Sequence, residues 1–139
     1  MKLNLISTPL DIVNTEGGKV MHAMKNIDNK FLLGEAYFSE INYLSVRAWK
    51  MHKIMTMNLI VPVGNIKFVF YNEKGDEKEE VIVGEKNYVR LTVPPKTWFG
   101  FMGLSKLKNL LLNLSDITHD KNEMKKKDIT EFDYKWSNL

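Results

Sequence analysis

Apolar side chains recur at alternate positions along residues 57–71, and no other feature of the sequence constrains the fold as strongly. In an extended chain every second residue points to the same side, so each apolar triplet shares one face. The two triplets are Leu59, Val61 and Val63, and then Ile66, Phe68 and Phe70. Gly64 and Asn65 stand between them, and such a pair is typical of a tight hairpin. The stretch therefore predicts two antiparallel strands joined by a two-residue turn.

Similar short apolar runs occur on both sides of this hairpin. They cover residues 31–43, 80–83, 88–93, 98–102 and 109–117. Polar turns such as "NEKGDEK" and "GEKN" separate them, and a double proline ends the run at 88–93. The last run is long enough for a helix, but its neighbours and its spacing favour a strand. Short strands at regular spacing are typical of sandwiches, jelly rolls and barrels, so we expect one all-β domain over residues 1–139.

The composition excludes several classes of function. There is no cysteine, so the chain forms neither a disulfide nor a thiolate metal site. The net charge is only +3, Arg47 and Arg90 are the only arginines, and lysines alternate with acids in "NEKGDEKEE" and "DKNEMKKKD". Nucleic-acid binders gather basic residues on one face, so we expect no nucleic-acid partner and interpret these runs as solvated turns. No apolar stretch approaches the roughly 18 residues of a membrane span, so we expect a cytoplasmic protein without a membrane partner.

Basic side chains gather in residues 47–53, just before the most apolar part of the chain. Arg47, Lys50, His52 and Lys53 form either a solvated strand end or the mouth of a pocket that handles anions and protons. A single histidine on a strand is often structural, but alternation places Lys50 and His52 on one face. A histidine beside cations tends to stay neutral, as a general base must, and the cations suit a diphosphate or an enolate. The cluster thus favours proton transfer on a phosphorylated or nucleotide-linked carbonyl compound.

Metal chemistry has little support in the sequence. A small β-barrel binds a metal through several histidine or carboxylate ligands that converge from neighbouring strands. Lys50, two positions before His52, is a poor ligand while protonated, and His22 and His119 are distant in sequence. No glycine-rich phosphate loop, nucleophile elbow or HExxH motif is present. We therefore expect no bound metal.

The C-terminal segment "EMKKKDITEFDYKWSNL" is polar apart from a few apolar residues, among them Phe132, Tyr134 and Trp136. Two interpretations fit these aromatic residues. Their rings pack on the exterior of the barrel, or the segment closes over a site or a subunit interface. Packing on the exterior is the simpler expectation.

Six motifs follow one another in a recognisable order. They are "GEAYFSEI", "VRAWKMHK", "VPVGNIKFVFYN", "YVRLTVPPKTWFGFMGLS", "LLLNLSDITHD" and "FDYKW", in a stretch from about residue 17 to Trp136. In this order they resemble the dTDP-4-dehydrorhamnose 3,5-epimerase family and its relatives, the 3,4-ketoisomerases of dTDP-4-keto-6-deoxyhexoses. The resemblance implies a cupin jelly roll that needs no metal or organic cofactor, and usually a homodimer whose N-terminal strands cross to the partner. It also implies proton removal from a carbon beside the C4 ketone, through an enolate, followed by reprotonation.

The resemblance assigns roles to residues of the basic cluster. Arg47 of "VRAW" matches the arginine that helps to hold the nucleotide diphosphate. The segment "KMHK" matches an H-x-H-K arrangement of the ketoisomerases, with Lys50 in place of the first histidine and with His52 and Lys53 retained. In the 3,5-epimerases the first position is the catalytic base, so this substitution removes their base.

At the other motif positions, this sequence matches the family at some residues and departs from it at others. Glu35 of "GEAYFS" falls near a polar substrate contact, and His119 of "ITHD" matches a motif of close relatives. The lysine that epimerases place early in the following strand falls near Met57, and the histidine after the double proline becomes Phe99. Residues 109–117 contain no tyrosine where the epimerases have their proton donor. Epimerisation by the standard residues is therefore not expected.

The sequence thus predicts an epimerase or ketoisomerase of a nucleotide-linked 4-keto-6-deoxyhexose, in the synthesis of deoxysugars for surface polysaccharides. We expect His52 to be the base and Lys50 to stabilise the enolate oxygen or hold phosphate. The expected substrate contacts are Arg47, Lys53, Glu35 and His119. The alternatives are a non-catalytic cupin that binds a nucleotide sugar or carbohydrate, and a cupin for an unrelated small anion. Apolar strands near the N-terminus, including "LNLI" and "AYFSEI", would be exposed edges in a monomer, so we expect a homodimer.

Overall fold

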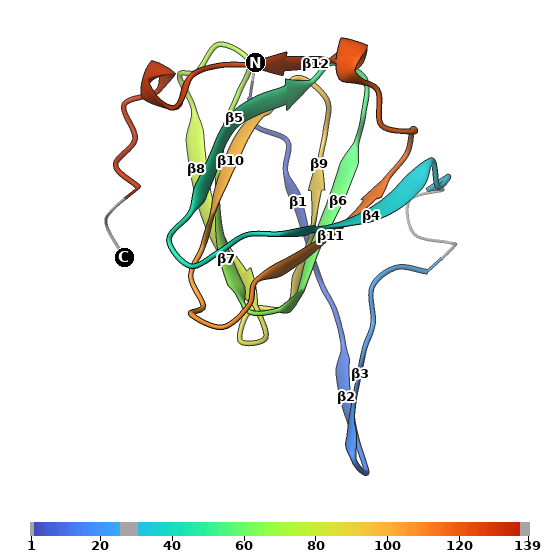
Figure 1. Cartoon of the computed structure of the whole chain (residues 1–139). Helices are drawn as coiled ribbons and strands as arrows, with labels where there is room; N and C mark the ends of the chain where they lie inside the picture. The colour runs from blue at the N-terminus through green and yellow to red at the C-terminus, as the bar shows by residue number, and fades with distance from the viewer. Residues whose placement is uncertain (1, 26–30, 137–139) are drawn as a thin grey trace.

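The computed structural model describes residues 2–25 and 31–136, and antiparallel strands dominate it. Two five-stranded sheets lie face to face, with the strand orders β1-β9-β6-β11-β4 and β12-β5-β10-β7-β8 (Figure 1). The strands are β1 (Ile6–Pro9), β2 (Ile12–Thr15), β3 (Gly18–Met21), β4 (Glu35–Glu40), β5 (Val46–His52), β6 (Met57–Val63), β7 (Asn65–Tyr71), β8 (Lys78–Gly84), β9 (Val89–Val93), β10 (Trp98–Gly103), β11 (Leu110–Ser115) and β12 (Met124–Lys126). Two 3-10 turns, η2 (Lys121–Glu123) and η3 (Ile129–Glu131), stand before and after β12. The all-β class predicted from the alternation is confirmed.

The pattern predicted the two strands β6 and β7, but the hairpin expected of them is wrong, because they do not pair with each other. The strand β6 lies between β9 and β11 in the first sheet, and β7 lies between β10 and β8 in the second. Gly64 joins them with a φ of +83°, a left-handed conformation that glycine adopts without steric cost. A Cβ atom at this position would also collide with the backbone of Lys108. Val63 is 44% exposed, although the pattern predicted that it shares the buried face of β6. The reason is an irregular register between β6 and β11 near Val63, which interrupts the alternation.

Apolar side chains from both sheets meet in an inner cluster. Its largest buried members are Ile41, Met55, Met57, Leu59, Ile66, Phe68, Phe70, Leu91, Phe99, Phe101 and Leu111. Burial of one such side chain stabilises the fold by about 1.5–3 kcal/mol. Some members of this cluster, together with polar side chains of β4, β5 and β11, line a space between the sheets.

The strand β5 contains a bulge that changes which side chains face the interior. Along its pairing with β10, Phe99 lies opposite Lys50, but the next residue, Gly100, lies opposite Ala48. Trp49 is therefore an additional residue in β5. An additional residue interrupts the alternation of side chains, so positions three apart can lie on the same face.

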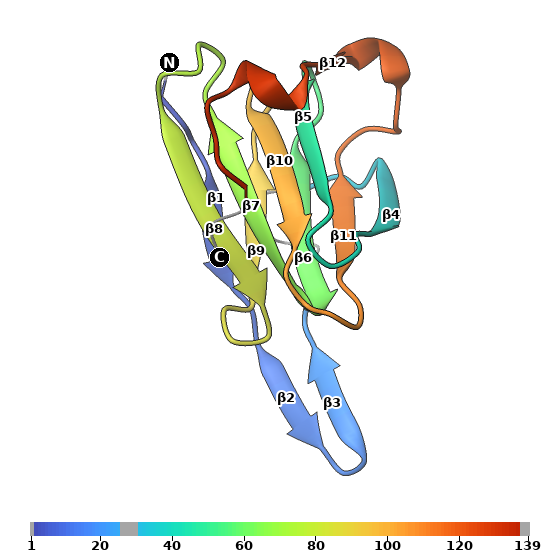
Figure 2. The ribbon, with the colours of Figure 1, turned by 60° about the vertical axis from the view of Figure 1, so that its left-hand side comes forward.

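An outer cluster of aromatic and apolar side chains covers the other face of the second sheet. It comprises Trp49, Met51, Val69, Tyr71, Trp98, Met102 and Trp136, with Phe132 and Tyr134 packed against it. Phe132 stacks on Tyr71 with ring centroids 4.1 Å apart, and Trp136 lies 5.4 Å from Trp49. Figure 2 shows the C-terminal segment passing over this sheet. The expectation that the aromatic residues of this segment pack on the exterior is confirmed.

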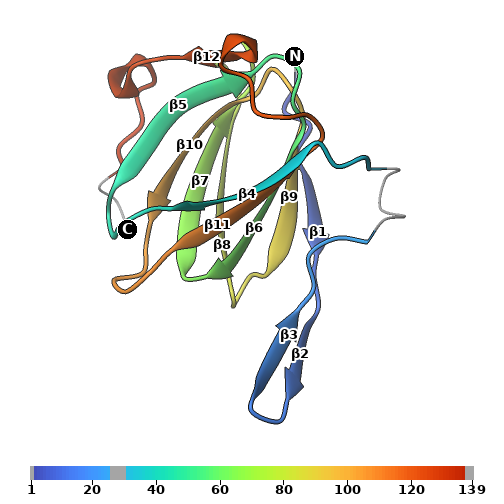
Figure 3. The ribbon, with the colours of Figure 1, turned by 45° about the vertical axis from the view of Figure 1, so that its right-hand side comes forward.

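The strands β2 and β3 form a hairpin that projects away from both sheets (Figures 1 and 3). Val13 and Val20 face each other across it and are 47% and 50% exposed. A lone two-stranded hairpin is at best marginally stable in water. The prediction of a strand at "LNLI" is wrong for its first residues, because β1 begins only at Ile6, and Leu3 and Leu5 pack against the inner cluster.

Candidate active site between the two sheets

A cavity of about 200 Å³ lies between the two sheets. Its polar lining consists of Tyr37, Ser39, Arg47, Lys50, His52, Asn113 and His119. Its apolar lining consists of Met57, Leu59, Phe68, Phe99, Phe101, Leu111 and Met124. An apolar pocket with a few convergent polar groups is typical of a small-molecule site. The prediction that the basic cluster of residues 47–53 lines a pocket is confirmed for three of its members.

His52 is the last residue of β5 and is only 5% exposed. Its Nδ1 atom is hydrogen-bonded to Oε1 of Glu123. The imidazole stacks on the ring of Phe99, with centroids 5.9 Å apart and an interplanar angle of 14°. Because an ionised carboxylate only accepts hydrogen bonds, it places the imidazole proton on Nδ1 and leaves the lone pair of Nε2 for the cavity. This tautomer is the one that a general base requires.

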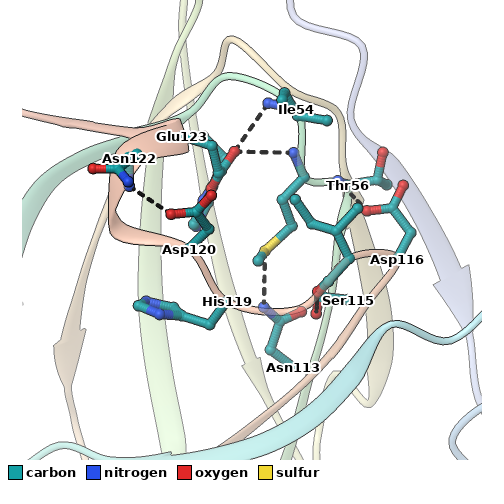
Figure 4. A network of polar contacts seen from close by, with 12 residues as sticks. Ile54, Thr56, Asn113, Ser115, Asp116, His119, Asp120, Asn122 and Glu123 are labelled. Carbon is teal, nitrogen blue, oxygen red and sulfur yellow. Dashed lines mark hydrogen bonds and ion pairs between the residues drawn. The ribbon is translucent and has the colours of Figure 1, made fainter.

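Glu123 reaches His52 from the C-terminal part of the chain. The turn η2 begins where the Asp120 carboxylate accepts the N–H of Asn122 at 2.9 Å (Figure 4). The strand β12 then pairs with the end of β5 and places Met124 opposite His52. The interpretation of "DKNEMKKKD" as a solvated turn is wrong for Glu123, which is 5% exposed. The start of the C-terminal segment therefore contributes to the site, while its aromatic end packs outside.

The Glu123 carboxylate is held in place by the backbone as well. Its second oxygen, Oε2, accepts the N–H groups of Ile54 at 3.0 Å and of Met55 at 3.2 Å (Figure 4). Burial by itself raises the pKa of Glu123, but the hydrogen bonds from His52, Ile54 and Met55 outweigh burial and lower it. The carboxylate is therefore ionised at neutral pH and fixes the orientation of the imidazole.

Arg47 lies at the edge of the cavity, on the same side as His52. The bulge at Trp49 explains this position, because regular alternation would turn residues 47 and 50 to opposite faces. The guanidinium donates a hydrogen bond to the Glu40 carbonyl oxygen at 2.8 Å and lies 5.9 Å from the ring centroid of Phe101. Arg47 therefore presents a fixed, exposed positive charge to the cavity.

Lys50 adds a second cation, which is partly buried. Its direct cross-strand partner on β12 is Lys126. Burial lowers the pKa of Lys50, and the positive charges of Lys126 and Arg47 lower it further. Like charges placed directly opposite one another destabilise a sheet, so this arrangement favours the binding of an anion.

Tyr37 of β4 and Asn113 of β11 form a hydrogen-bonded pair on the opposite wall. The Asn113 amide donates from Nδ2 to the Tyr37 hydroxyl oxygen at 2.9 Å, and its Oδ1 accepts the N–H of Asn58 at 3.1 Å. Burial raises the pKa of the Tyr37 hydroxyl, the hydrogen bond from Asn113 lowers it, and the carboxylates of Glu35 and Glu123 raise it. Because the net direction is upward, Tyr37 stays a neutral phenol at neutral pH.

The other predicted contacts lie at or outside the edge of the cavity. His119 lines it, with its ring edge-on to Tyr37 at a centroid distance of 6.2 Å. Glu35 does not line it, but its Oε1 accepts the backbone N–H of His119 at 2.9 Å and so positions the loop. Lys53 is exposed just after β5 and also lies outside the cavity lining. The roles of these three residues as substrate contacts stay predictions.

Three residues of the site were missed by the sequence analysis. For Asn113 a signal was present, because Leu111, Asn113 and Ser115 form the buried face of β11 and a buried amide requires partners. The same alternation applies to Tyr37 in β4. For Glu123 there was no such signal, since charged residues surround it and only the pairing of β12 with β5 brings it to the cavity.

Neither a membrane-spanning helix nor a cluster of metal ligands is present in residues 2–25 and 31–136. No helix in these ranges has the length and apolar character needed to cross a bilayer. No group of three or more histidine, aspartate or glutamate side chains in these ranges is placed to hold a metal ion. His52 and His119, the two histidines of the cavity, are thus not part of a three-ligand group.

Comparison with known proteins gives matches among solved structures. No protein-family model matches the sequence, and no curated protein sequence matches it. A dTDP sugar isomerase from Desulfovibrio desulfuricans G20 is 33% identical, the match covers 97% of this chain and 92% of that one, and the TM-score is 0.89.

Two remoter structures share the fold. QdtA, a sugar 3,4-ketoisomerase from Thermoanaerobacterium thermosaccharolyticum in complex with TDP, is 19% identical over 91% of this chain and 90% of its own, with a TM-score of 0.78. The 3,5-epimerase RmlC from Legionella pneumophila, in complex with dTDP-4-keto-L-rhamnose, is 13% identical over 90% of this chain and 73% of its own, with a TM-score of 0.79. The predicted cupin jelly roll is confirmed by these matches.

Proposed function

The chain belongs to the dTDP-sugar isomerase family, and on that premise we propose that it isomerises or epimerises a nucleotide-linked 4-keto-6-deoxyhexose. The family is the one that the sequence motifs predicted. The reaction removes a proton from a carbon beside the C4 ketone and returns a proton to a carbon of the same sugar. We place this reaction in the cytoplasmic synthesis of deoxysugars for surface polysaccharides.

The buried pair of His52 and Glu123 carries this proposal. A structural histidine on a strand usually binds a backbone carbonyl, whereas the Nδ1 atom of His52 binds an ionised carboxylate and its ring borders the cavity. The carboxylate orients the imidazole and stabilises the imidazolium that forms when Nε2 accepts the proton. A base positioned in this way contributes a rate factor of roughly 10²–10⁴.

Besides a base, the reaction requires stabilisation of the enolate, and cations on the same side as His52 can supply it. An enolate oxygen develops negative charge beside the carbon that loses its proton, and fixed positive charge stabilises it. Lys50 lines the same cavity as His52, so its positive charge can stabilise this oxygen, while Arg47 suits bidentate contact with the diphosphate. Lys126, opposite Lys50, extends the positive charge toward the exterior.

A binding protein without catalysis is the second candidate function. Lys50, which stands where the resembling motif has a histidine, favours this candidate. The imidazole–carboxylate pair favours catalysis, because a pure binding site has no need of an oriented base.

We also propose that the protein is a homodimer. The projecting hairpin of β2 and β3, with Val13 and Val20 exposed, supports this assembly because a second chain would cover it. The edge strand β4 exposes Phe38 (63%) in the same way. Light scattering at micromolar concentration tests the proposal, and a monomer at that concentration would contradict it.

Proton exchange in heavy water tests the proposed function. The protein is incubated in D₂O with dTDP-4-keto-6-deoxyglucose and related 4-keto sugars, and deuterium is located by NMR. Deuterium at C3 or C5, above the level without protein, is the expected result. Binding of dTDP without exchange in any sugar would contradict catalysis and support the binding protein.

A further inference from the structure

The C-terminal segment connects the cavity to the outer cluster. It begins with Glu123, which is hydrogen-bonded to His52, and its aromatic residues Phe132, Tyr134 and Trp136 pack on the outer face of the second sheet (Figure 2). On the proposed function above, we propose that Phe132 is a positioning residue for the reaction. Its contacts outside the sandwich hold the strand β12 against β5, and β12 in turn keeps the Glu123 carboxylate on the imidazole of the base.

The strand β12 is poorly suited to stay in place through its own pairing. It has only three residues and lies at the edge of its sheet. Lys125 and Lys126 of the strand are followed directly by Lys127, and Lys126 lies opposite Lys50 on β5. Neighbouring and opposed like charges destabilise such a pairing. Contacts from outside the strand are therefore needed to keep β12 against β5.

Backbone hydrogen bonds connect the two ends of β12 to β5. At the cavity end, the N–H of Lys53 donates to the carbonyl oxygen of Glu123 at 2.7 Å. At the outer end, the N–H of Trp49 donates to the carbonyl oxygen of Lys127 at 3.1 Å, and the N–H of Lys127 donates back at 3.0 Å. The Trp49 indole N–H also donates to the carbonyl oxygen of Ile129 at 3.2 Å. Because these groups lie on one short piece of backbone, a displacement at the outer end moves Glu123 as well.

The ring of Phe132 fixes this outer end. It stacks on Tyr71 with centroids 4.1 Å apart and an interplanar angle of 6°, and it meets Trp49 edge-on at 5.0 Å. The ammonium group of Lys127 lies 4.9 Å from the centroid of Phe132 and 4.5 Å from that of Trp98. Aromatic pairs and cation–π contacts of this geometry are attractive. Phe132 therefore joins the sheet, the additional residue of β5 and the residue that follows β12.

The position of the Glu123 backbone decides whether its carboxylate reaches the imidazole. Its Oε2 is bonded to the N–H groups of Ile54 and Met55, and a carboxylate held through one oxygen can still turn about it. The contact of Oε1 with Nδ1 of His52 therefore depends on the register that places Met124 opposite His52. A displacement of about 1 Å that originates far from the reacting atoms can slow catalysis roughly 100-fold.

The variant Phe132→Ala tests the inference, because Phe132 is half-buried and lies outside the cavity lining. Phe132→Tyr keeps the ring and is the conservative variant. Met102→Ala is the control for general destabilisation, since it removes a buried side chain of the same outer cluster from β10. We expect Phe132→Ala to slow exchange in heavy water, per folded molecule at saturating sugar, roughly 10–100-fold. We expect Phe132→Tyr and Met102→Ala to exchange within about threefold of wild type.

A double variant shows whether Phe132 acts through Glu123. In the Glu123→Gln background the charge that Phe132 positions is already gone, so adding Phe132→Ala should slow exchange by less than about a further threefold. An effect of Phe132 that is independent of Glu123 would instead multiply the two losses. Multiplied losses would therefore overturn the inference, as would exchange by Phe132→Ala within about threefold of an active wild type.

Nitrogen NMR of the His52 imidazole separates this inference from the proposed function, because it needs no reaction. A proton on Nδ1 reports the contact with Glu123. We expect this signal in wild type, Phe132→Tyr and Met102→Ala, and its loss or weakening in Phe132→Ala. Wild-type protein that exchanges no 4-keto sugar overturns the proposed function. In that case a loss of the signal in Phe132→Ala still supports the positioning of Glu123 by Phe132, and an unchanged signal overturns both.

Discussion

The two ends of the sandwich each contain a buried polar side chain that accepts backbone N–H groups, but only one of these side chains is charged and contacts a residue of the cavity. At one end, Asn109 is 1% exposed and its Oδ1 accepts the N–H groups of Asn65 and Ser105, each at 3.0 Å. Its Nδ2 donates to the carbonyl oxygens of Ile41 at 3.1 Å and of Ser105 at 2.9 Å. The amide is neutral, and both of its polar atoms are used to join turns.

At the other end, Glu123 accepts two backbone N–H groups through Oε2 and binds His52 through Oε1. The carboxylate is ionised, and its charge acts on an imidazole whose second nitrogen is left for the cavity. Burial of a polar group is therefore not by itself a sign of function. A buried charge that is connected to a cavity is such a sign.

Glu123→Gln should strongly reduce activity and have only a small effect on folding. The amide oxygen can still accept the N–H groups of Ile54 and Met55, so the free energy of unfolding should fall by only about 1–2 kcal/mol. The charge that orients and stabilises the imidazole is lost, so exchange in heavy water should slow roughly 10³-fold. Exchange within about tenfold of wild type in a folded variant would remove Glu123 from the mechanism.

Asn109→Ala should show the opposite pattern. It leaves two buried N–H groups and two carbonyl oxygens without their partner, so the free energy of unfolding should fall by about 2–4 kcal/mol. Urea unfolding measures this loss. The exchange rate per folded molecule should stay at the wild-type value, because Asn109 is not part of the cavity lining. A large loss of exchange in the folded variant would contradict a purely structural role of Asn109.

Lys126→Met should weaken the binding of dTDP roughly fivefold, because it removes a positive charge beside Lys50. The matched control is Lys125→Met on the same strand. Lys125 lies opposite Met51, whose side chain belongs to the outer cluster, so its removal should change the dissociation constant by less than about twofold. Calorimetric titration at low salt measures both. Equal losses in the two variants would show that only the overall charge matters.

The smallest effect concerns acid stability. The folded-state pKa of Glu123 is lowered, so the unfolded chain takes up its proton first as the pH falls. The stability contributed by Glu123 is therefore complete above its ordinary pKa of about 4.3 and is lost as the pH falls through the lower folded value. Urea unfolding of wild type and Glu123→Gln should differ at pH 7 and converge in acid. A difference that persists unchanged in acid would contradict the ionised pair.

The sequence could predict the strands of this fold but only part of the site. The two-residue period is a local property, so the bounds of β6 and β7 could be read directly from residues 57–71. The position of His52 and Lys50 on one face followed from the same period. The bulge at Trp49 could not be predicted, because the pairing with β10 reveals it. Glu123 could not be predicted either, because its contact with His52 joins residues 71 positions apart.

The identity of the base is the central claim, and exchange at the carbon beside the ketone in heavy water tests it most directly. Wild type, His52→Asn and Lys50→Met are compared with the same 4-keto sugar, and dTDP binding is measured for each. We predict that His52→Asn abolishes exchange while dTDP binding stays within about threefold, and that Lys50→Met slows exchange roughly 100-fold without abolishing it. Full exchange by His52→Asn together with none by Lys50→Met would contradict the account and make Lys50 the base.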